Sequence, residues 1–227
     1  MKYPEDYTNK IIQGDCLDVM KGIPDKSVDL VLTDPPYGIN LNTNFSSMKN
    51  DKSFKGKKMG TDYDKIENDI LFNFESYWQE LKRISNKFII FGADYFMDND
   101  LLNKGSLSIW DKRLTESADK IFGSCFETIW FYPKRKRDII RYKWAGLFGM
   151  ENEKINKRLH PTQKPENLIQ KLVRDHSEEG QIILDPFIGS GTTAVACKNL
   201  KRNFIGIEIS EDYCKIARDR LKQQILL

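Results

Sequence analysis

Residues 184–193 read Leu-Asp-Pro-Phe-Ile-Gly-Ser-Gly-Thr-Thr, and they continue the apolar run that begins at residue 181. The run has the composition of a buried strand, and residues 192–200 have the spacing of a helix. Glycines at such a turn let the backbone approach a ligand closely because they carry no Cβ. The helix that follows offers unpaired N–H groups. The stretch therefore predicts a strand, a ligand-binding turn and a helix.

The same alternation recurs along the chain. Apolar runs predict buried strands at residues 10–13, 28–33, 87–91, 181–184 and 203–207. Helical patterns lie at residues 16–22, 72–84, 165–175, 192–200 and 211–224, the last with Ser210 as the expected N-cap. Two aromatic-rich runs, 107–110 and 128–132, predict antiparallel strands. We expect an α/β fold with a doubly wound, mostly parallel sheet and an antiparallel edge hairpin.

Composition sets the class of protein. The 227 residues are 40% hydrophobic and 11% aromatic with a net charge of +3, which favours one globular domain over residues 1–227. The four cysteines have no C-x-x-C spacing, so neither a disulfide framework nor a metal site is expected. Residues 1–10 do not resemble a signal peptide, and no apolar run is long enough for a membrane span. We expect a cytoplasmic protein without a membrane partner.

A second motif, Thr33-Asp34-Pro35-Pro36-Tyr37-Gly38, follows the apolar run at 28–33. Consecutive prolines end the strand and fix an extended backbone. The Asp34 carboxylate and the Pro35 carbonyl then form two preset acceptors, and Tyr37 adds an aromatic face. Two acceptors and a flat ring suit an aromatic amine, whose N–H groups they can accept while the base stacks. The motif therefore predicts an amine-activating site.

An acidic residue completes the site predicted at residues 184–193. Glu208 follows the strand predicted at 203–207, where a carboxylate can hold ribose hydroxyls. The glycine spacing differs from the dinucleotide-binding G-x-G-x-x-G, and the lysine of a P-loop is missing, which disfavours NAD and ATP. Residues 185–208 are therefore expected to form a cofactor site of another kind.

These motifs resemble those of the amino-group DNA methyltransferases, which act on adenine N6 or cytosine N4. Residues 34–37 are similar to the catalytic motif, and residues 185–191 are similar to the cofactor motif. Their order resembles the permuted β group of the family. Two further motifs are similar as well, Gly14-Asp15-Cys16-Leu17 and His160-Pro161-Thr162-Gln163-Lys164-Pro165. The resemblance covers nearly the whole chain and is weakest at residues 41–66 and 133–158.

The resemblance implies a seven-stranded, Rossmann-like methyltransferase sheet with the Asp34 and Asp185 strands side by side at its centre. It implies S-adenosylmethionine as the cofactor and Asp34, Pro35, Pro36 and Tyr37 as the catalytic residues. The implied cofactor-binding residues are Asp15, Cys16, Asp34, Lys164, Asp185, Phe187, Gly189, Ser190, Gly191, Thr192, Thr193, Glu208 and Ile209. Among these, Glu208 would hold the ribose, Asp15 and Cys16 would border the adenine, and Lys164 would lie near the methionine carboxylate. Asp15 is also a candidate helix N-cap.

Two polar, basic segments, residues 41–66 and 133–159, are candidate DNA-contacting loops. The second carries the expected phosphate-binding residues, Lys134, Arg135, Lys136, Arg137, Arg141 and Lys143. A base inside a duplex cannot reach the predicted site unless it is flipped out. The expected partner is double-stranded DNA. A homodimer, a restriction-modification partner and a mobile-element context stay open, as does the recognised sequence.

The resemblance favours an adenine-specific DNA methyltransferase, because relatives acting on cytosine N4 more often carry Ser where this chain has Asp34. Cytosine N4 methylation is the first alternative. Methylation of a protein amide is another, although such enzymes typically carry Asn at this position. A non-catalytic DNA-binding relative is the third, and the intact residues 34–37 argue against it.

Overall fold

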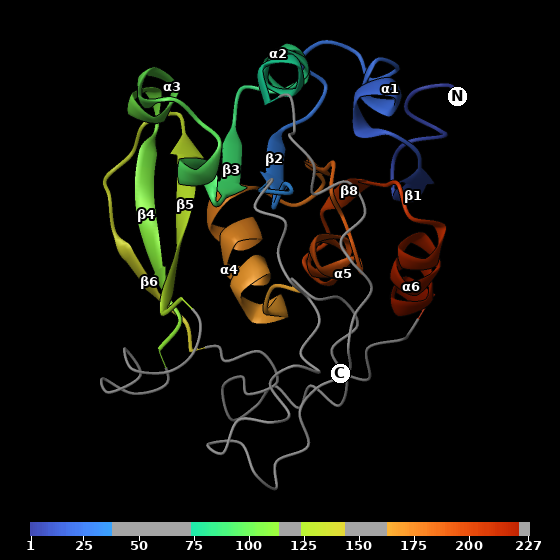
Figure 1. The fold of residues 1–227 in the computed structure, drawn as a ribbon. Coiled ribbons are helices and arrows are strands. Elements are labelled where there is room, and N and C mark those ends of the chain that lie inside the picture. The colour runs from blue at the N-terminus through green and yellow to red at the C-terminus, as the bar shows by residue number, and fades with distance from the viewer. Residues whose placement is uncertain (38–73, 114–123, 144–162, 223–227) are drawn as a thin grey trace, which may run out of the picture.

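The computed structural model describes residues 1–37, 74–113, 124–143 and 163–222. Within them, one eight-stranded sheet has the order β1-β8-β7-β2-β3-β5-β4-β6 (Figure 1). In chain order its strands are β1 (Lys10–Gln13), β2 (Leu30–Thr33), β3 (Phe88–Phe91), β4 (Ser106–Asp111), β5 (Phe126–Tyr132), β6 (Ile139–Arg141), β7 (Ile182–Asp185) and β8 (Asn203–Glu208). The pairs β1–β8, β8–β7, β7–β2 and β2–β3 are parallel, and β5 is antiparallel to both of its neighbours.

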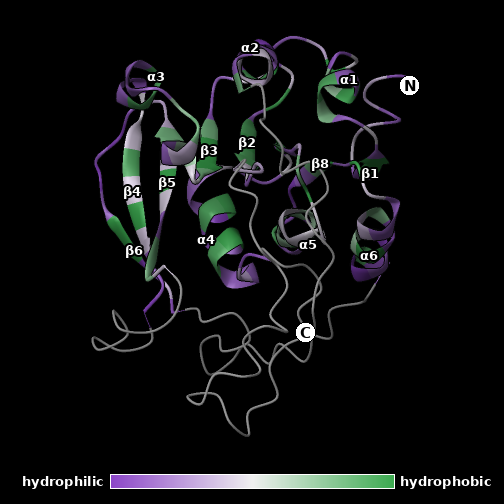
Figure 2. Ribbon diagram, viewed as in Figure 1, coloured by the Kyte–Doolittle hydropathy of each residue, from purple (hydrophilic) through white to green (hydrophobic). Residues whose placement is uncertain are grey.

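Helices cover both faces of the sheet. One side carries α1 (Cys16–Met20), α2 (Phe74–Ile84) and α3 (Asn99–Lys104), and the other carries α4 (Glu166–His176), α5 (Thr192–Asn199) and α6 (Glu211–Lys222), as Figure 1 shows. Two apolar cores follow from this layering, because successive side chains of a buried strand point to opposite faces. In β2, for example, Leu30 and Leu32 join the α4–α6 core, whereas Val31 joins the α1–α3 core. Figure 2 shows hydrophobic residues along β2 and β3.

The α/β sheet predicted from the sequence is confirmed, with two differences. In the part of the chain that the structure describes, the sheet has eight strands rather than seven, because β6 arises within the segment 133–159, which we predicted to be irregular. The predicted hairpin of β4 and β5 therefore does not form the edge, since β6 pairs with β4 outside it. Helix α3 was also missed; it begins at an N-cap, Asp98, whose side chain accepts from the Leu101 N–H at 2.7 Å. The predicted loop at 41–66 and the rest of the second loop, 144–159, lie outside the described residues.

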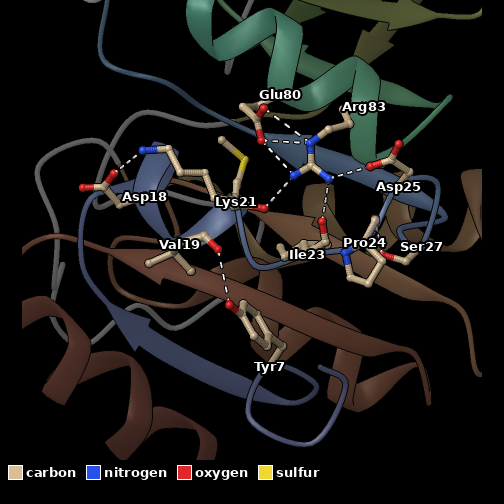
Figure 3. Close-up of polar contacts among 11 residues, drawn as sticks. Tyr7, Asp18, Val19, Lys21, Ile23, Pro24, Asp25, Ser27, Glu80 and Arg83 are labelled. Atoms are coloured by element: carbon tan, nitrogen blue, oxygen red, sulfur yellow. Dashed lines mark hydrogen bonds and ion pairs between the residues drawn. The ribbon is translucent and has the colours of Figure 1, made fainter. Parts of the chain in front are cut away.

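Helix α2 fixes the entry to β2 through Arg83 (Figure 3). The Arg83 guanidinium donates to the carbonyl oxygens of Met20 at 2.8 Å and Ile23 at 2.7 Å. It also pairs with Asp25 and Glu80, each at 2.8 Å. Five donors in a fixed plane allow one side chain to satisfy several acceptors at once. The connection between α1 and β2 is thus tied to α2 ahead of the start of β2.

No helix in residues 1–37, 74–113, 124–143 and 163–222 has both the length and the apolar character that a membrane crossing needs.

The expected N-caps of two helices are present. Asp15 accepts from the Leu17 N–H at 2.8 Å at the start of α1, and Ser210 accepts from the Tyr213 N–H at 3.5 Å at the start of α6.

Candidate active site

The two motifs that the sequence singled out follow neighbouring strands. Strand β2 pairs in parallel with β7, with Leu30 opposite Ile183 and Val31 opposite Leu184. Because both strands run in the same direction, Asp34 and Asp185 emerge at the same edge of the sheet. Ligands of open α/β sheets bind outside this carboxyl edge. The expectation that the two strands lie side by side at the sheet centre is confirmed.

Asp34 is held by two hydrogen bonds. The Tyr37 hydroxyl donates to Oδ1 at 2.5 Å, and the Lys164 ammonium donates to Oδ2 at 2.6 Å. The pKa of Asp34 is raised because burial outweighs the opposing effect of Lys164. A carboxylate has about four lone-pair sites, so each oxygen keeps one site for a further donor. Asp34 can therefore accept from a substrate amine without losing either contact.

Lys164 lies between two carboxylates. Its Nζ is 2.6 Å from Asp34 Oδ2 and 3.1 Å from Glu127 Oε2, and it sits 5.1 Å from the centre of the Phe91 ring. Although burial acts to lower it, the pKa of Lys164 is raised on balance by the two carboxylates. The predicted place of this ammonium beside the methionine carboxylate stays a prediction.

Glu127 was missed in the sequence. It lies on β5, and its Oε1 accepts from Lys112 at 2.9 Å. Although burial acts to raise it, the pKa of Glu127 is lowered by Lys164 and Lys112. One signal was available, since Glu127 is the charged residue in an otherwise apolar and β-branched run from residue 126 to 132. A carboxylate in such a strand needs a buried cation.

Tyr37 presents its ring close to the end of β3. The ring stacks on Tyr95 with centroids 4.8 Å apart and planes 10° from parallel. Gly92 has a left-handed backbone with φ of 62°, and a Cβ at Gly92 would overlap the Tyr37 ring. Tyr95 is 55% exposed. The edge next to Asp34 therefore carries two aromatic rings, one of them unexpected and open to solvent.

The turn after β7 is held by two acidic side chains. Asp185 accepts from the Thr193 hydroxyl at 2.6 Å and from the Phe187 N–H at 3.2 Å. Glu208, at the end of β8, accepts from the Gly189 N–H at 3.0 Å and the Ser210 N–H at 2.9 Å. Burial raises the pKa of Asp185 to about 7. These contacts shape the glycine turn from both of its flanking strands.

Two glycines and an arginine complete this turn. Gly189 and Gly191 have positive φ angles, 51° and 87°. Arg220 of α6, which the sequence did not single out, donates to the Ser190 carbonyl at 2.7 Å and to the Thr192 hydroxyl at 3.2 Å. The same guanidinium lies 3.5 Å from Glu166 at the start of α4. Helix α6 therefore supports the turn from the side that faces the α4–α6 core.

The remaining predicted cofactor residues lie along the same edge. Asp15 and Cys16 follow β1, which pairs with β8 so that Gln13 lies opposite Glu208. Cys16 is buried, and burial, reinforced by Asp15, raises the pKa of its thiol to about 12. Ile209 is 44% exposed beside Glu208. A carboxylate with an exposed apolar side chain next to a glycine turn suits a nucleoside, whose hydroxyls need acceptors and whose base needs an apolar face.

The predicted DNA-binding residues fall into two groups. Arg141 lies opposite Asp111 in the β4–β6 register, at the edge of the sheet where Asp34 lies, and Lys143 follows it. By contrast, residues 134–137 follow Tyr132, which pairs with Phe88 at the start of β3. They therefore lie at the opposite edge. Two of them have partners, since Arg135 pairs with Asp138 and Lys134 donates to the Asn103 carbonyl.

The site combines a glycine turn suited to a nucleoside, a buried carboxylate acceptor and an aromatic ring. A family model described as DNA methylase, of the N6/N4 class, matches residues 28–219. The chain belongs to this DNA methylase family. The type II methyltransferase M.HinfI of Haemophilus influenzae is 28% identical over 96% of this chain and 69% of its own length. M1.MboII of Moraxella bovis is 27% identical over 95% of this chain and 97% of its own length.

Solved structures agree on the fold. The M1.HpyAVI complex with S-adenosylmethionine is 25% identical, covers 94% of this chain and 99% of its own, and gives a TM-score of 0.57. The PvuII methyltransferase, which is cytosine-N4-specific, is 18% identical, covers 96% of this chain and 87% of its own, and gives a TM-score of 0.61. Because the cytosine-N4-specific PvuII methyltransferase shares this architecture, the sheet by itself does not assign the target base.

Proposed function

We propose that this DNA methylase transfers a methyl group from S-adenosylmethionine to the N6 amine of adenine in DNA. One observation carries the proposal: the Asp34 carboxylate stands at the end of β2, directly beside the glycine turn that follows β7. A donor held by the turn and an amine held by Asp34 would meet at one edge of the sheet. Holding both reactants in place can lower a barrier by about 7–11 kcal/mol.

The residues at the edge fit the cofactor. Glu208 would accept from the ribose hydroxyls, Ile209 and the neutral Cys16 thiol offer apolar contact to the adenine, and the turn at 187–193 would surround the methionine part. When bound, the cofactor supplies a methyl group activated by a positive sulfonium. The chain's own contribution is to orient it. Asp185 and Arg220 keep the turn in shape without contacting the reacting atoms.

Asp34 and the Pro35 carbonyl would accept the two N–H groups of the target amine. These hydrogen bonds pull the lone pair out of conjugation with the ring and aim it at the methyl donor, which is an electrostatic form of catalysis. The base must leave the duplex first, at a cost of a few kcal/mol. Stacking on Tyr37, and on Tyr95 beside it, is worth about 1–3 kcal/mol per base and would offset much of that cost.

The aspartate at position 34 supports adenine, by the resemblance to relatives of known base preference. The type II relatives support a role in restriction-modification. The experiment offers the intact chain labelled cofactor with either unmethylated DNA of mixed sequence or protein acceptors, and the DNA is then digested to nucleosides. We expect label in N6-methyladenine. Label in N4-methylcytosine would overturn the choice of base, and label in a protein acceptor alone would overturn the DNA substrate.

Arg141 and Lys143 support DNA binding at the edge that holds Asp34, whereas residues 134–137 lie across the sheet. Strands of four residues span about 13 Å, so a duplex that delivers a base to Asp34 is expected to contact the first group. The double variant Arg141→Ala/Lys143→Ala should lower the slope of log affinity against log salt by about 1–2. The matched variant Lys136→Ala/Arg137→Ala should leave the slope unchanged, and the reverse pattern would contradict this assignment.

A further inference from the structure

Four charged side chains of alternating sign connect Asp34 to β4. Lys164 Nζ lies 2.6 Å from Asp34 Oδ2 and 3.1 Å from Glu127 Oε2. Lys112 Nζ lies 2.9 Å from Glu127 Oε1. Three segments far apart in the sequence supply these groups besides the Asp34 motif itself, namely the end of β4, the start of β5 and the segment before α4. The set holds two positive and two negative charges, so it is neutral as a whole.

All four side chains are shielded from water. Their exposed fractions are 11% for Lys164, 19% for Asp34, 25% for Glu127 and 16% for Lys112. An ammonium at this depth needs partners to offset lost hydration. Lys164 has two carboxylates and the Phe91 ring, whose centre lies 5.1 Å away. The ammonium is therefore shared between Asp34 and Glu127 instead of belonging to Asp34 alone.

Sharing matters because Asp34 must accept the substrate amine. A cation held only by Asp34 would draw its electron density and compete with the amine for Oδ2. A cation removed altogether would leave a buried carboxylate facing Glu127, which favours the protonated form. The position between the two carboxylates avoids both extremes. Glu127 does not reach the reacting atoms, so its effect on Asp34 passes through Lys164 and through charge.

We propose that Glu127 is a positioning residue: it shares the Lys164 ammonium with Asp34, so that Lys164 holds Asp34 ionised while Asp34 stays able to accept from the target amine. The proposal rests on the proposed function, since it assigns Asp34 to the amine. It names a residue outside the four motifs on which the family resemblance was argued, residues 14–17, 34–37, 160–165 and 185–191. Lys112 supports it by holding the other oxygen of Glu127.

Within the described residues, the titratable groups that face Asp34 come from four segments. They are Tyr37 from its own segment, Lys164 from the segment before α4, Glu127 from β5 and Asp185 from β7. Among them Lys164 and Tyr37 favour the ionised carboxylate, whereas Glu127 disfavours it. Removing Lys164 and removing the charge of Glu127 must therefore shift the ionisation of Asp34 in opposite directions.

The test is the pH profile of single-turnover methyl transfer at saturating S-adenosylmethionine with unmethylated DNA of mixed sequence. The acid limb of this profile is the pH range in which the rate rises as Asp34 ionises. Lys164→Met should move the acid limb to higher pH, and Glu127→Gln should move it to lower pH. Both should slow the step at the plateau by about ten- to a hundredfold, because the acceptor is misplaced or occupied. Cofactor affinity and the unfolding temperature, measured on the same preparations, should stay near those of the wild type in Glu127→Gln.

Matched controls come from an exposed pair on α4, Lys171 and Asp175, 2.5 Å apart. Lys171→Met and Asp175→Asn make the same charge changes at the surface and should leave the acid limb in place. The proposal would be overturned if the acid limb does not shift in Lys164→Met and Glu127→Gln, or if it shifts in the same direction in both. A loss of cofactor affinity in Lys164→Met without a limb shift would also overturn it, and would assign Lys164 to the methionine carboxylate. If the wild type methylates no DNA, the proposed function fails; an active wild type without opposite shifts refutes only the role of Glu127.

Discussion

Two aspartates, each followed by proline at the end of neighbouring parallel strands, are held in different ways. Asp185 accepts from the Thr193 hydroxyl and the Phe187 N–H, two groups within its own segment. Asp34 accepts from Tyr37 nearby and from Lys164, 130 residues further along the chain. Asp185 therefore shapes a local turn, whereas Asp34 is positioned in part by a cation from a distant segment of the chain. The comparison teaches that similar motifs at one sheet edge can divide into a structural and a chemical role.

The largest expected effect comes from removing the chemical aspartate. Asp34→Ala should slow methyl transfer by at least about 10²–10³-fold, the usual loss for one preorganised electrostatic partner. Cofactor affinity should change little, because the turn after β7 keeps its own contacts. Transfer rates and equilibrium cofactor binding, measured in parallel, check this. A variant that binds the cofactor normally and transfers at the wild-type rate would remove Asp34 from the mechanism.

A substitution at Gly191, in the turn after β7, should weaken cofactor binding and not the methyl-transfer step, the opposite of the expectation for Asp34→Ala. The φ of Gly191 is 87°, and a Cβ would lie 2.8 Å from the Ala217 Cβ of α6. Gly191→Ala should therefore lower the free energy of unfolding by about 1–3 kcal/mol and weaken cofactor binding. Denaturant unfolding and a binding titration measure both. Adding Ala217→Gly should recover part of the loss, because it relieves the overlap and leaves the backbone strain; no recovery would contradict the packing argument.

A pH dependence separates the two aspartates further. Burial raises the pKa of Asp185 to about 7, above the value of about 3.9 in an unfolded chain. Between these values the folded state binds the extra proton, so this group's contribution to stability is complete below about pH 4 and is lost as pH rises to about 7. The wild type minus Asp185→Asn difference in unfolding free energy should fall across this window, by at most about 4 kcal/mol. A difference that is flat or rises with pH would contradict burial as the dominant influence on the pKa of Asp185.

Much of this division could be predicted from the sequence. Asp185, Gly189 and Glu208 are joined by short-range spacing and strand order, so the turn followed from local patterns. The pairing of β2 with β7 was implied by the resemblance to the permuted group of the family. Glu127 and Lys164 could not be joined in this way, because their contact depends on the antiparallel strand β5, the neighbour of β3, starting at the sheet edge where β2 ends. Likewise, the basic residues of 134–141 looked like one patch, and the course of β5 and β6 separates them.

The smallest expected effect concerns the short contact within the Asp34 motif. Tyr37→Phe removes the hydroxyl that donates to Asp34 Oδ1 at 2.5 Å and keeps the ring stacked on Tyr95. Because stacking is preserved, we expect only a several-fold slower transfer, close to the net worth of one hydrogen bond, about 1 kcal/mol. Transfer rates at saturating DNA measure it. A loss as large as that of Asp34→Ala would show that the hydroxyl, and not the ring, carries the role of Tyr37.

The central claim is that the turn after β7 holds the methyl donor and Asp34 holds the amine. Single-turnover methyl transfer to DNA at saturating S-adenosylmethionine tests it most directly, with wild type, Asp34→Ala and Gly191→Ala compared side by side. Saturation should bring Gly191→Ala close to the wild-type rate, because its defect lies in binding, and should leave Asp34→Ala at least about 10²-fold slower. An Asp34→Ala rate restored by saturating cofactor, or a Gly191→Ala rate that saturation does not improve, would contradict the division of roles.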